Sequence, residues 1–308
     1  MEPRLKLREP SLYSYHKLYE DGFLFVMKKH AILLLTCPDK RGIVAQVSQF
    51  LYTHGANIVE ASEYRDYNKA LFCMRVEWSM SSSSLSIKEF RKKFLPIAKE
   101  YKMKWRMTLK DSRLRVVIFV SKEDHCLADL LYRYQKKELL CNVALVISNH
   151  ENCEKLVNFY NIPFYNISLN NRRRKEKQIL KLLQQFEIEL IVLARYMQIL
   201  SPYFANQYKE RIINIHHSFL PAFKGAKPYH QAYARGVKII GATSHYVTDA
   251  LDEGPIIEQD IVRISHKDSV ADMKRKGRDL ERVVLSRAIR WHIENRILTY
   301  GHKTVIFD

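Results

Sequence analysis

The chain has 308 residues, with 51 lysines and arginines against 33 aspartates and glutamates, which gives a formal net charge of +18. This length favours two domains, and a hydrophobic share of 47% is ample for their cores. No apolar run approaches the roughly 20 residues of a membrane span, and "FLFVM" at 23–27 is too short for the apolar core of a signal peptide, so we expect a cytoplasmic protein without a membrane partner.

The lysines and arginines are dispersed along the chain, and their densest runs lie at 171–178 and 274–278. No nucleic-acid-binding motif accompanies either run, so we expect no nucleic-acid partner. We interpret the charge as a solvated surface, whose field would also favour anionic small substrates.

Residues 1–28 precede the first regular pattern, and we interpret them as an extension, either a disordered segment or an artefact of an upstream start codon. The next region, 29–110, shows the periods of a small α/β domain, with apolar residues three or four apart in the helical segments. The expected elements are strand 31–36, helix 43–55, strands 57–66 and 70–78, helix 86–103 and strand 104–109. This β-α-β-β-α-β order is the ferredoxin-like arrangement.

A polar linker at 110–113 separates this domain from a second one at 113–308. There, apolar strands alternate with helices, which predicts right-handed crossovers and an open, mostly parallel Rossmann-like sheet. These strands are expected at 114–121, 143–148, 163–168, 188–194 and 211–216. Two long alternating strands follow at 238–248 and 255–264, then a helix at 269–294 and a strand at 303–307.

Motifs for metals and nucleotides are missing from the sequence. The five cysteines are widely spaced and form no Cys-x-x-Cys pair, which predicts buried free thiols and no metal site. The chain has no Gly-x-Ser-x-Gly elbow, His-Glu-x-x-His, Walker loop or Gly-x-Gly-x-x-Gly, which argues against serine hydrolases, zinc proteases and phosphate-cradling loops.

The stretch "INIHHS" lies at the end of a predicted strand, where open α/β sheets bind their ligands. A period of two places Asn214 and His216 on the same face of that strand. An isolated histidine is more often structural. Two polar residues at this spacing, followed by His217, Ser218 and a proline-bounded loop, favour a site.

The turn "VTDALDEGP" carries Asp249, Asp252 and Glu253 between two predicted strands. Aspartate is common in turns for conformational reasons. A carboxylate beside a histidine and an asparagine is nevertheless a hydrolytic set: the carboxylate orients or activates water, the histidine moves protons, and the amide stabilises an oxyanion. A third segment, "LARYMQIL" at 193–200, either lines an apolar slot for a flat ligand or packs in the core.

Two long stretches resemble a known family. "NIHHSFLPAFKGAKPYHQ", with the later "LDEGP", resembles the formyltetrahydrofolate deformylases, which are relatives of the glycinamide ribonucleotide formyltransferases. This resemblance extends over 113–308. "CPDKRGIVAQVSQFLYTHGANI" resembles an ACT domain, the small amino-acid-sensing module of that family. The implied fold is an ACT domain followed by a formyltransferase-type sheet.

The resemblance implies a hydrolase acting on a linear amide-type C–N bond, which converts 10-formyltetrahydrofolate to formate and tetrahydrofolate. It implies that the enzyme supplies formate for purine synthesis and balances one-carbon folate pools, with folate as substrate and no cofactor. The family's catalytic residues correspond to Asn214, His216 and Asp252. Its substrate contacts correspond to Arg195, Met197, Leu200, Val247 and Asp249.

Three features favour water over an amine as the formyl acceptor. The transferases typically carry a Gly-Ser-Asn-type loop after the first strand, whereas this chain reads "SKEDHC". They usually have proline where this chain has His217, and they lack an ACT domain. We expect His217 and the altered loop to close the acceptor cleft. The alternative is a formyltransferase that uses an amine such as glycinamide ribonucleotide.

The resemblance to an ACT domain also implies regulation. In the family this domain is associated with glycine and methionine as effectors and with binding between subunits, so we expect a homo-oligomer. The candidate effector-binding residues are Asp39, Gly42 and Asn57, which flank the first turn and the end of the first helix. The alternative is a scaffold that only mediates oligomerisation.

Overall fold

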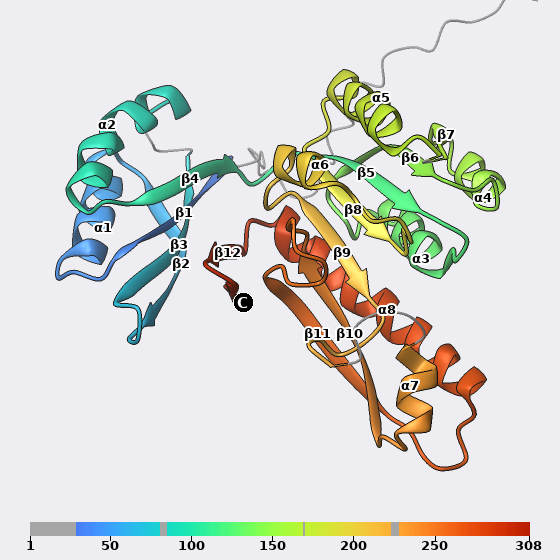
Figure 1. Cartoon of the computed structure of the whole chain (residues 1–308). Coiled ribbons are helices and arrows are strands. Elements are labelled where there is room, and N and C mark those ends of the chain that lie inside the picture. The colour runs from blue at the N-terminus through green and yellow to red at the C-terminus, as the bar shows by residue number, and fades with distance from the viewer. Residues whose placement is uncertain (1–28, 81–84, 169, 223–227) are drawn as a thin grey trace, which may run out of the picture.

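The computed structural model describes residues 29–80, 85–168, 170–222 and 228–308. The extension expected at 1–28 lies outside these residues. The described chain forms a four-stranded sheet with two helices, a seven-stranded sheet with helices on both faces, and a C-terminal hairpin that lies between the two sheets (Figure 1).

The four-stranded unit has the predicted β-α-β-β-α-β order. Its elements are β1 (His30–Pro38), α1 (Ile43–Thr53), β2 (Asn57–Asp66), β3 (Leu71–Ser79), α2 (Ile87–Glu100) and β4 (Lys104–Leu109). The strands lie in the order β2-β3-β1-β4, and each neighbouring pair is antiparallel. The ferredoxin-like arrangement is therefore confirmed.

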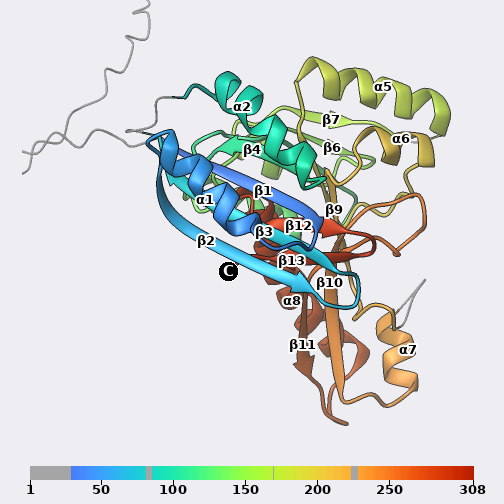
Figure 2. The ribbon, with the colours of Figure 1, turned by 90° about the vertical axis from the view of Figure 1, so that its left-hand side faces the viewer.

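Both helices cover one face of this sheet, as Figure 2 shows. α1 buries the four residues that its spacing predicts: Ile43, Val47, Phe50 and Leu51. α2 begins with a capping box, because Ser86 accepts a hydrogen bond from the backbone of Glu89 and the Glu89 carboxylate accepts one from the backbone of Ser86. Phe90 of α2 then stacks on Trp78 of β3, with 5.1 Å between the ring centroids.

The seven-stranded unit begins at β5 (Arg115–Val120). It continues through α3 (His125–Gln135), β6 (Asn142–Ser148), α4 (Glu154–Phe159), β7 (Phe164–Asn166), α5 (Arg172–Gln185), β8 (Leu190–Ala194), α6 (Pro202–Gln207), β9 (Ile212–His216), α7 (Pro228–Ala234), β10 (Ile239–Tyr246), β11 (Ile256–Arg263) and α8 (Val270–Ile293). The strand order is β11-β10-β9-β8-β5-β6-β7. Strands β9 to β7 are parallel, while β10 and β11 are antiparallel, so the predicted mostly parallel sheet is confirmed.

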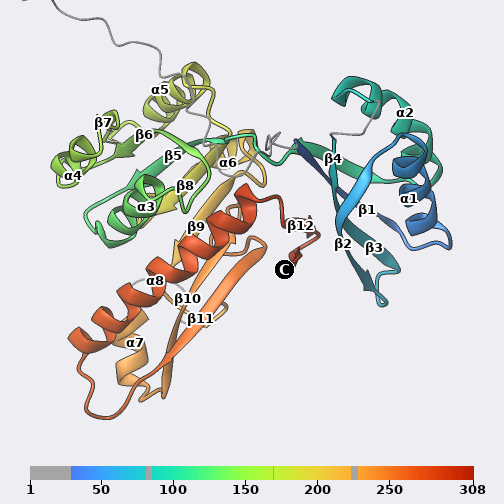
Figure 3. The ribbon, with the colours of Figure 1, turned by 180° about the vertical axis from the view of Figure 1, so that it is seen from behind.

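Helices cover both faces of this sheet, which explains why its parallel strands are continuously apolar. Val116 and Ile118 of β5 pack in one core with α3, α4 and α8, and Figure 3 shows α8 in front of that face. Val117 and Phe119 pack in the other core with α5 and α6. This double layer leaves the carboxyl ends of the parallel strands as the place for a site.

The C-terminal hairpin, β12 (Ile297–Tyr300) and β13 (Lys303–Ile306), joins the two units. Leu298 and Phe307 pack on Leu34 and Cys73, on the face of the four-stranded sheet that α1 and α2 leave open. The Tyr300 hydroxyl adds a hydrogen bond of 3.0 Å to an Asp66 carboxylate oxygen. Of this hairpin only the second strand was predicted, and α7 was not predicted.

The state of the cysteines and the charges on the longest described helix agree with what the sequence predicts. All five cysteines are buried free thiols, as predicted. The longest helix, α8, has 24 residues and carries many charges along its length. Among the residues that the structure describes, no helix is both long and apolar enough to cross a membrane.

Candidate active site

A cavity of about 300 Å³ lies beside β8 and β9, between the segment 195–200 and the turn 247–252. The three residues expected to act in catalysis line this cavity: Asn214, His216 and Asp252. The five residues expected to contact the substrate also line it: Arg195, Met197, Leu200, Val247 and Asp249. The fold thus brings together, around one cavity, side chains that lie far apart in the chain.

The register between β9 and β10 sets the positions of Asn214 and His216. Asn214 lies opposite His245, and His216 lies opposite Thr243, so both side chains of β9 project from the same face. The Thr243 hydroxyl donates a hydrogen bond of 2.8 Å to the Ser218 carbonyl, and it accepts one of 3.0 Å from the Leu220 backbone. These bonds fix the chain that leaves β9 directly after His216.

Gly254 determines how the turn after β10 folds back toward β9. The Tyr246 backbone N–H donates a hydrogen bond of 2.9 Å to the Pro255 carbonyl. A Cβ atom on Gly254 would lie 1.6 Å from the Tyr246 carbonyl oxygen, so only glycine fits at this approach. Asp252, two residues earlier, takes a left-handed backbone conformation with φ of 56°. The tight turn thereby directs the Asp252 carboxylate toward β9.

Asp252 and His216 form an acid–imidazole pair. His216 Nδ1 lies 3.3 Å from Asp252 Oδ2, and both side chains are largely buried. Burial raises the pKa of Asp252, but the hydrogen bond and charge of His216 outweigh it and hold this pKa well below its usual range. The second ring nitrogen of His216, Nε2, is buried and has no hydrogen-bond partner among the described residues. One nitrogen of His216 is therefore held by an ionised carboxylate, and the other is free for a substrate or water.

His245 belongs to this site, although the sequence did not single it out. Its Nδ1 lies 2.9 Å from the Tyr246 carbonyl oxygen, which can only accept, so Nδ1 carries the proton. The other ring nitrogen, Nε2, then accepts a hydrogen bond from Asn214 Nδ2 at 3.2 Å and lies 3.7 Å from Asp252 Oδ1. His245 thus fixes which way the Asn214 amide points. The signal that could have identified it is its position at the end of a predicted strand, directly before the turn that carries Asp252.

The segment 195–200 forms the outer wall of the cavity. Met197 is held by its backbone N–H, which donates to the Ser121 hydroxyl at 2.9 Å. The side chains of Met197 and Ile199 are 57% and 60% exposed, whereas Leu200 is 9% exposed. The sequence left open whether this segment lines a slot or packs in the core, and the structure shows both: Met197 and Ile199 lie at the rim, and Leu200 packs inside.

A buried polar cluster adjoins the cavity around Glu281 of α8. Its carboxylate lies 2.8 Å from His125 Nε2 and accepts a hydrogen bond of 2.8 Å from the Tyr229 hydroxyl. The guanidinium of Arg195 lies 3.5 Å away. Burial raises the pKa of Glu281, but the bond from His125 and the charge of Arg195 outweigh it and lower this pKa. The cluster therefore holds a buried ionised carboxylate.

His217 lies between this cluster and the His216–Asp252 pair. Its ring stacks on His216 at 5.3 Å and tilts against Tyr229 at 6.0 Å, measured between ring centroids. Burial, followed by the charge of Arg195, lowers the pKa of His217 to about 4, so the ring is neutral near pH 7. His217 thus forms a neutral wall between the two groups of polar side chains.

Three metal-ligating side chain types come together in the described part of the chain: His125, Cys126 and Glu281. They fit a hydrogen-bonded cluster better than a metal site. Glu281 already binds His125 and Tyr229, and the nearby guanidinium of Arg195 would repel a cation. Burial also raises the pKa of Cys126 well above its usual value, which disfavours the thiolate that a metal requires.

The candidate effector residues do not converge within one chain. Asp39 and Gly42 lie just before α1, where Gly42 takes a φ of 88°. Asn57 begins β2, beyond the far end of this 11-residue helix, which is about 16 Å long. Asp39 is also engaged by the Arg65 guanidinium at 2.5 Å.

The comparisons with known proteins agree with this fold and site. A model of the formyl transferase family matches residues 114–289. A formyltetrahydrofolate deformylase from Synechocystis sp. is 50% identical over 90% of this chain and 98% of its own length. The crystal structure of a formyltetrahydrofolate deformylase from Pseudomonas syringae pv. tomato is 48% identical, with a TM-score of 0.90 over 92% of this chain and 96% of that chain.

The fold and site therefore define a protein of the formyl transferase class, and the match over both units narrows this class. A glycinamide ribonucleotide transformylase from Symbiobacterium toebii is only 29% identical, with a TM-score of 0.61 over 64% of this chain and 95% of that one. The chain belongs to the formyltetrahydrofolate deformylase family.

Proposed function

We propose that the chain hydrolyses 10-formyltetrahydrofolate to formate and tetrahydrofolate, so that it supplies formate for purine synthesis and balances one-carbon folate pools. One observation carries this proposal: Asp252 holds Nδ1 of His216, while Nε2 of the same ring is buried without a partner in the described residues. The Asn214 amide projects beside it into the same cavity. The deformylases to which the chain is similar support this reaction.

The reaction begins with the formyl carbonyl oxygen accepting a hydrogen bond from Asn214 Nδ2, whose other N–H is donated to His245. His216 Nε2 removes a proton from water, and the resulting hydroxide attacks the formyl carbon. Asn214 and the imidazolium of His216 stabilise the tetrahedral oxyanion. The bond between the formyl carbon and N10 then breaks, N10 takes the proton from His216, and formate and tetrahydrofolate leave.

The role of Asp252 follows from its charge. A carboxylate whose pKa lies well below the usual range is a weak base at neutral pH, so Asp252 is poorly suited to deprotonate water itself. It is suited to orient His216 and to balance the charge of the imidazolium. We therefore assign proton transfer to His216 and its support to Asp252. These steps require only water and side chains of the chain, with folate as substrate and without a cofactor or metal.

The cluster around Glu281 supports water as the acceptor. His125, at the start of α3, comes from the loop after β5, where the transferase relatives would place a phosphate-binding loop. Its ring and the Tyr229 hydroxyl both bind Glu281, and His217 packs against Tyr229. These contacts place the ionised Glu281 carboxylate and its partners on one side of the His216–Asp252 pair, next to a cavity of about 160 Å³ lined by His217 and Tyr229. An amine acceptor that carries a phosphate would meet this carboxylate, whereas water carries no such charge.

The test is incubation of the purified chain with 10-formyltetrahydrofolate in the absence of any amine. Formate and tetrahydrofolate should accumulate in equal amounts. Adding glycinamide ribonucleotide should leave the rate and yield of formate unchanged. Formate that appears only when the amine is added, or a formylated amine as the main product, would favour the transferase alternative.

We also propose that residues 29–110 form an ACT regulatory domain, that glycine and methionine are its effectors, and that the protein is a homo-oligomer. The β-α-β-β-α-β order and the contact of the C-terminal hairpin with the open sheet face support a module coupled to the catalytic unit. Because Asn57 lies beyond the far end of α1 from Asp39, a site using both would need a second copy. Isothermal titration with each amino acid, combined with sedimentation, tests this; heat from neither would favour the scaffold alternative.

A further inference from the structure

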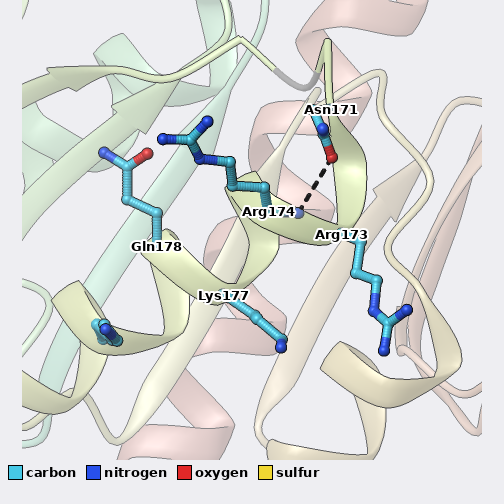
Figure 4. Close-up of a pocket in the computed structure, with 6 residues that line it drawn as sticks. Asn171, Arg173, Arg174, Lys177 and Gln178 are labelled. Atoms are coloured by element: carbon cyan, nitrogen blue, oxygen red, sulfur yellow. Dashed lines mark hydrogen bonds between the residues drawn. The ribbon is translucent and has the colours of Figure 1, made fainter.

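The outer face of α5 carries a strongly basic groove. The groove has a volume of about 610 Å³. Figure 4 shows the side chains that line it. Its lining residues are Asn171, Arg173, Arg174, Lys177, Gln178 and Lys181. The helix holds a single carboxylate, Glu176, which is 3% exposed and lies on the opposite, inward face. No acidic side chain of α5 therefore neutralises the groove.

The four cations of this groove are also unpaired with the rest of the described chain. No carboxylate of the described residues lies within 4 Å of Arg173, Arg174, Lys177 or Lys181. The second basic run, on α8, behaves differently. There, Arg275 pairs with Asp272 at 3.1 Å. The α5 groove thus keeps four cationic side chains that no carboxylate of the described residues pairs with, and their charge is left for an external anion.

The first turn of α5 is bound to the rim of the catalytic cavity. The Arg172 guanidinium donates to the Ile199 carbonyl. Glu176 accepts a hydrogen bond of 2.8 Å from the Ser201 backbone N–H, and it also binds the Ser201 hydroxyl. Ile199 itself lines the catalytic cavity and is 60% exposed. Asn171 and Arg173, which line the basic groove, flank Arg172 in the chain, so one end of the groove lies within a helical turn of the bond to the cavity rim.

We propose that the α5 groove binds the γ-glutamyl tail of the folate substrate. This inference rests on the proposed function, because it assumes that the cavity holds the pterin end of 10-formyltetrahydrofolate. Each γ-linked glutamate adds one carboxylate to the tail. Arg173 and Lys181 are eight residues apart, which is about 12 Å along a helix. This is the reach of about two or three γ-linked residues, since each has two more chain atoms than an α-linked residue.

A tail bound outside the reacting centre contributes equally in the ground state and the transition state, so it lowers KM and leaves kcat unchanged. Because each exposed ion pair contributes little, several together should lower KM by about tenfold for a pentaglutamate relative to a monoglutamate. The advantage should shrink as salt rises above about 0.1 M, where the screening length falls to about 10 Å.

The experiment compares KM for 10-formyltetrahydrofolate as monoglutamate and as pentaglutamate, in the full chain at low salt. The test variant removes four charges from α5: Arg173→Gln, Arg174→Gln, Lys177→Gln and Lys181→Gln. A matched control removes four charges from exposed positions on and near α8: Lys267→Gln, Lys274→Gln, Arg275→Gln and Arg278→Gln. The control distinguishes a local site from the general field of a chain with net charge +18.

We expect the wild type and the α8 control to share the roughly tenfold preference for the pentaglutamate, and the α5 variant to lose it through a higher KM for the pentaglutamate. Equal KM values for both substrates in the wild type would overturn the proposal. An equal loss of the pentaglutamate preference in the α5 and α8 variants would overturn it as well, because the preference would then come from the overall charge of the chain.

Binding of tetrahydrofolate as monoglutamate and as pentaglutamate, measured by titration, separates this proposal from the proposed function. A chain that prefers the pentaglutamate through α5 but releases no formate supports the tail site and overturns the hydrolysis. A chain that releases formate without any preference for the pentaglutamate overturns only the tail site.

Discussion

The seven-stranded unit and the four-stranded unit hold their predicted functional residues in different ways. In the first, Asn214, His216 and Asp252 converge around one cavity, and His216 and Asp252 are in contact. In the second, Asp39 and Asn57 lie at opposite ends of α1. The residues predicted to act in catalysis therefore come together within one chain, whereas an effector site built from both ends of α1 needs a second chain.

The largest effect should come from removing the charge of Asp252. Asp252→Asn leaves His216 without its ionised partner, so kcat should fall by about 10²–10⁴-fold. The control is Asp279→Asn on α8, whose carboxylate is 63% exposed and is not part of the cavity lining. Formate release measures both variants. A turnover for Asp252→Asn close to the wild-type rate would remove the acid–imidazole pair from the account.

The hydrogen bond between His245 and Asn214 predicts a smaller loss of kcat when His245 is replaced. His245→Ala should lower kcat by about tenfold, since it removes one hydrogen bond that orients the Asn214 amide. It should have little further effect in an Asn214→Ala background, because the two residues act as a unit. If the fold-loss in kcat of the double variant equals the product of the two single losses, His245 acts independently of Asn214.

The turn that carries Asp252 predicts a large effect on stability. Gly254→Ala should lower the free energy of unfolding by about 2–3 kcal/mol, because the added Cβ meets the Tyr246 carbonyl oxygen. Gly236→Ala is the matched control. Gly236 also has a positive φ, of 62°, but no atom near its Cβ position, so it should cost only about 1 kcal/mol. Chemical denaturation of both variants checks this, and equal costs would contradict the close approach at Gly254.

Buried histidines of the catalytic unit predict how stability depends on pH. In the folded chain the pKa of His217 is lowered to about 4 from an ordinary value near 6.5. The unfolded chain therefore takes up a proton between these values while the folded chain does not, so stability falls as pH drops from about 6.5 to 4. Asp252 acts in a lower pH range. Its lowered pKa contributes stability that is fully present above about pH 4 and is lost as pH falls further.

Melting temperatures measured between about pH 7 and 4.5 test this linkage. His217→Asn should flatten the slope. Part of it should remain, because burial lowers the pKa of His292 to about 3. The exposed His302→Asn is the control and should keep the wild-type slope. Identical slopes in the wild type and His217→Asn would show that His217 is not held neutral by burial.

The hydrogen bond between Tyr300 and Asp66, which joins the two units, predicts the smallest effect on stability. Tyr300→Phe removes the hydrogen bond to Asp66 and should lower the free energy of unfolding by about 1 kcal/mol. Tyr233→Phe is the control, because Tyr233 is 54% exposed on α7. No difference between these variants in chemical denaturation would mean that this hydrogen bond contributes nothing to the joining of the units.

Much of this fold could be predicted from the sequence, because its elements have clear periods. The four-stranded order and the parallel sheet followed from apolar spacing, and β2 and β4 have the predicted bounds. α7 and β12 were missed because seven and four residues are too few to show a period. β12 also forms only by pairing with β13 and packing on the other unit.

The site was predictable in part for similar reasons. Asn214 and His216 share a strand, so their common face follows from local geometry. His245 was missed because its role depends on the register between β9 and β10. The cluster around Glu281 and the bond from Arg172 to Ile199 join residues distant in sequence, and only the packed fold brings them together.

The most direct test of the central claim is to follow the oxygen of the attacking water. The wild-type chain would be supplied with 10-formyltetrahydrofolate in ¹⁸O-labelled water without any amine, and the formate analysed by mass spectrometry. We predict formate that carries one oxygen from the solvent, formed at a rate that Asp252→Asn strongly reduces. Formate without solvent oxygen, or labelled formate released equally fast by Asp252→Asn, would contradict hydrolysis by Asn214, His216 and Asp252.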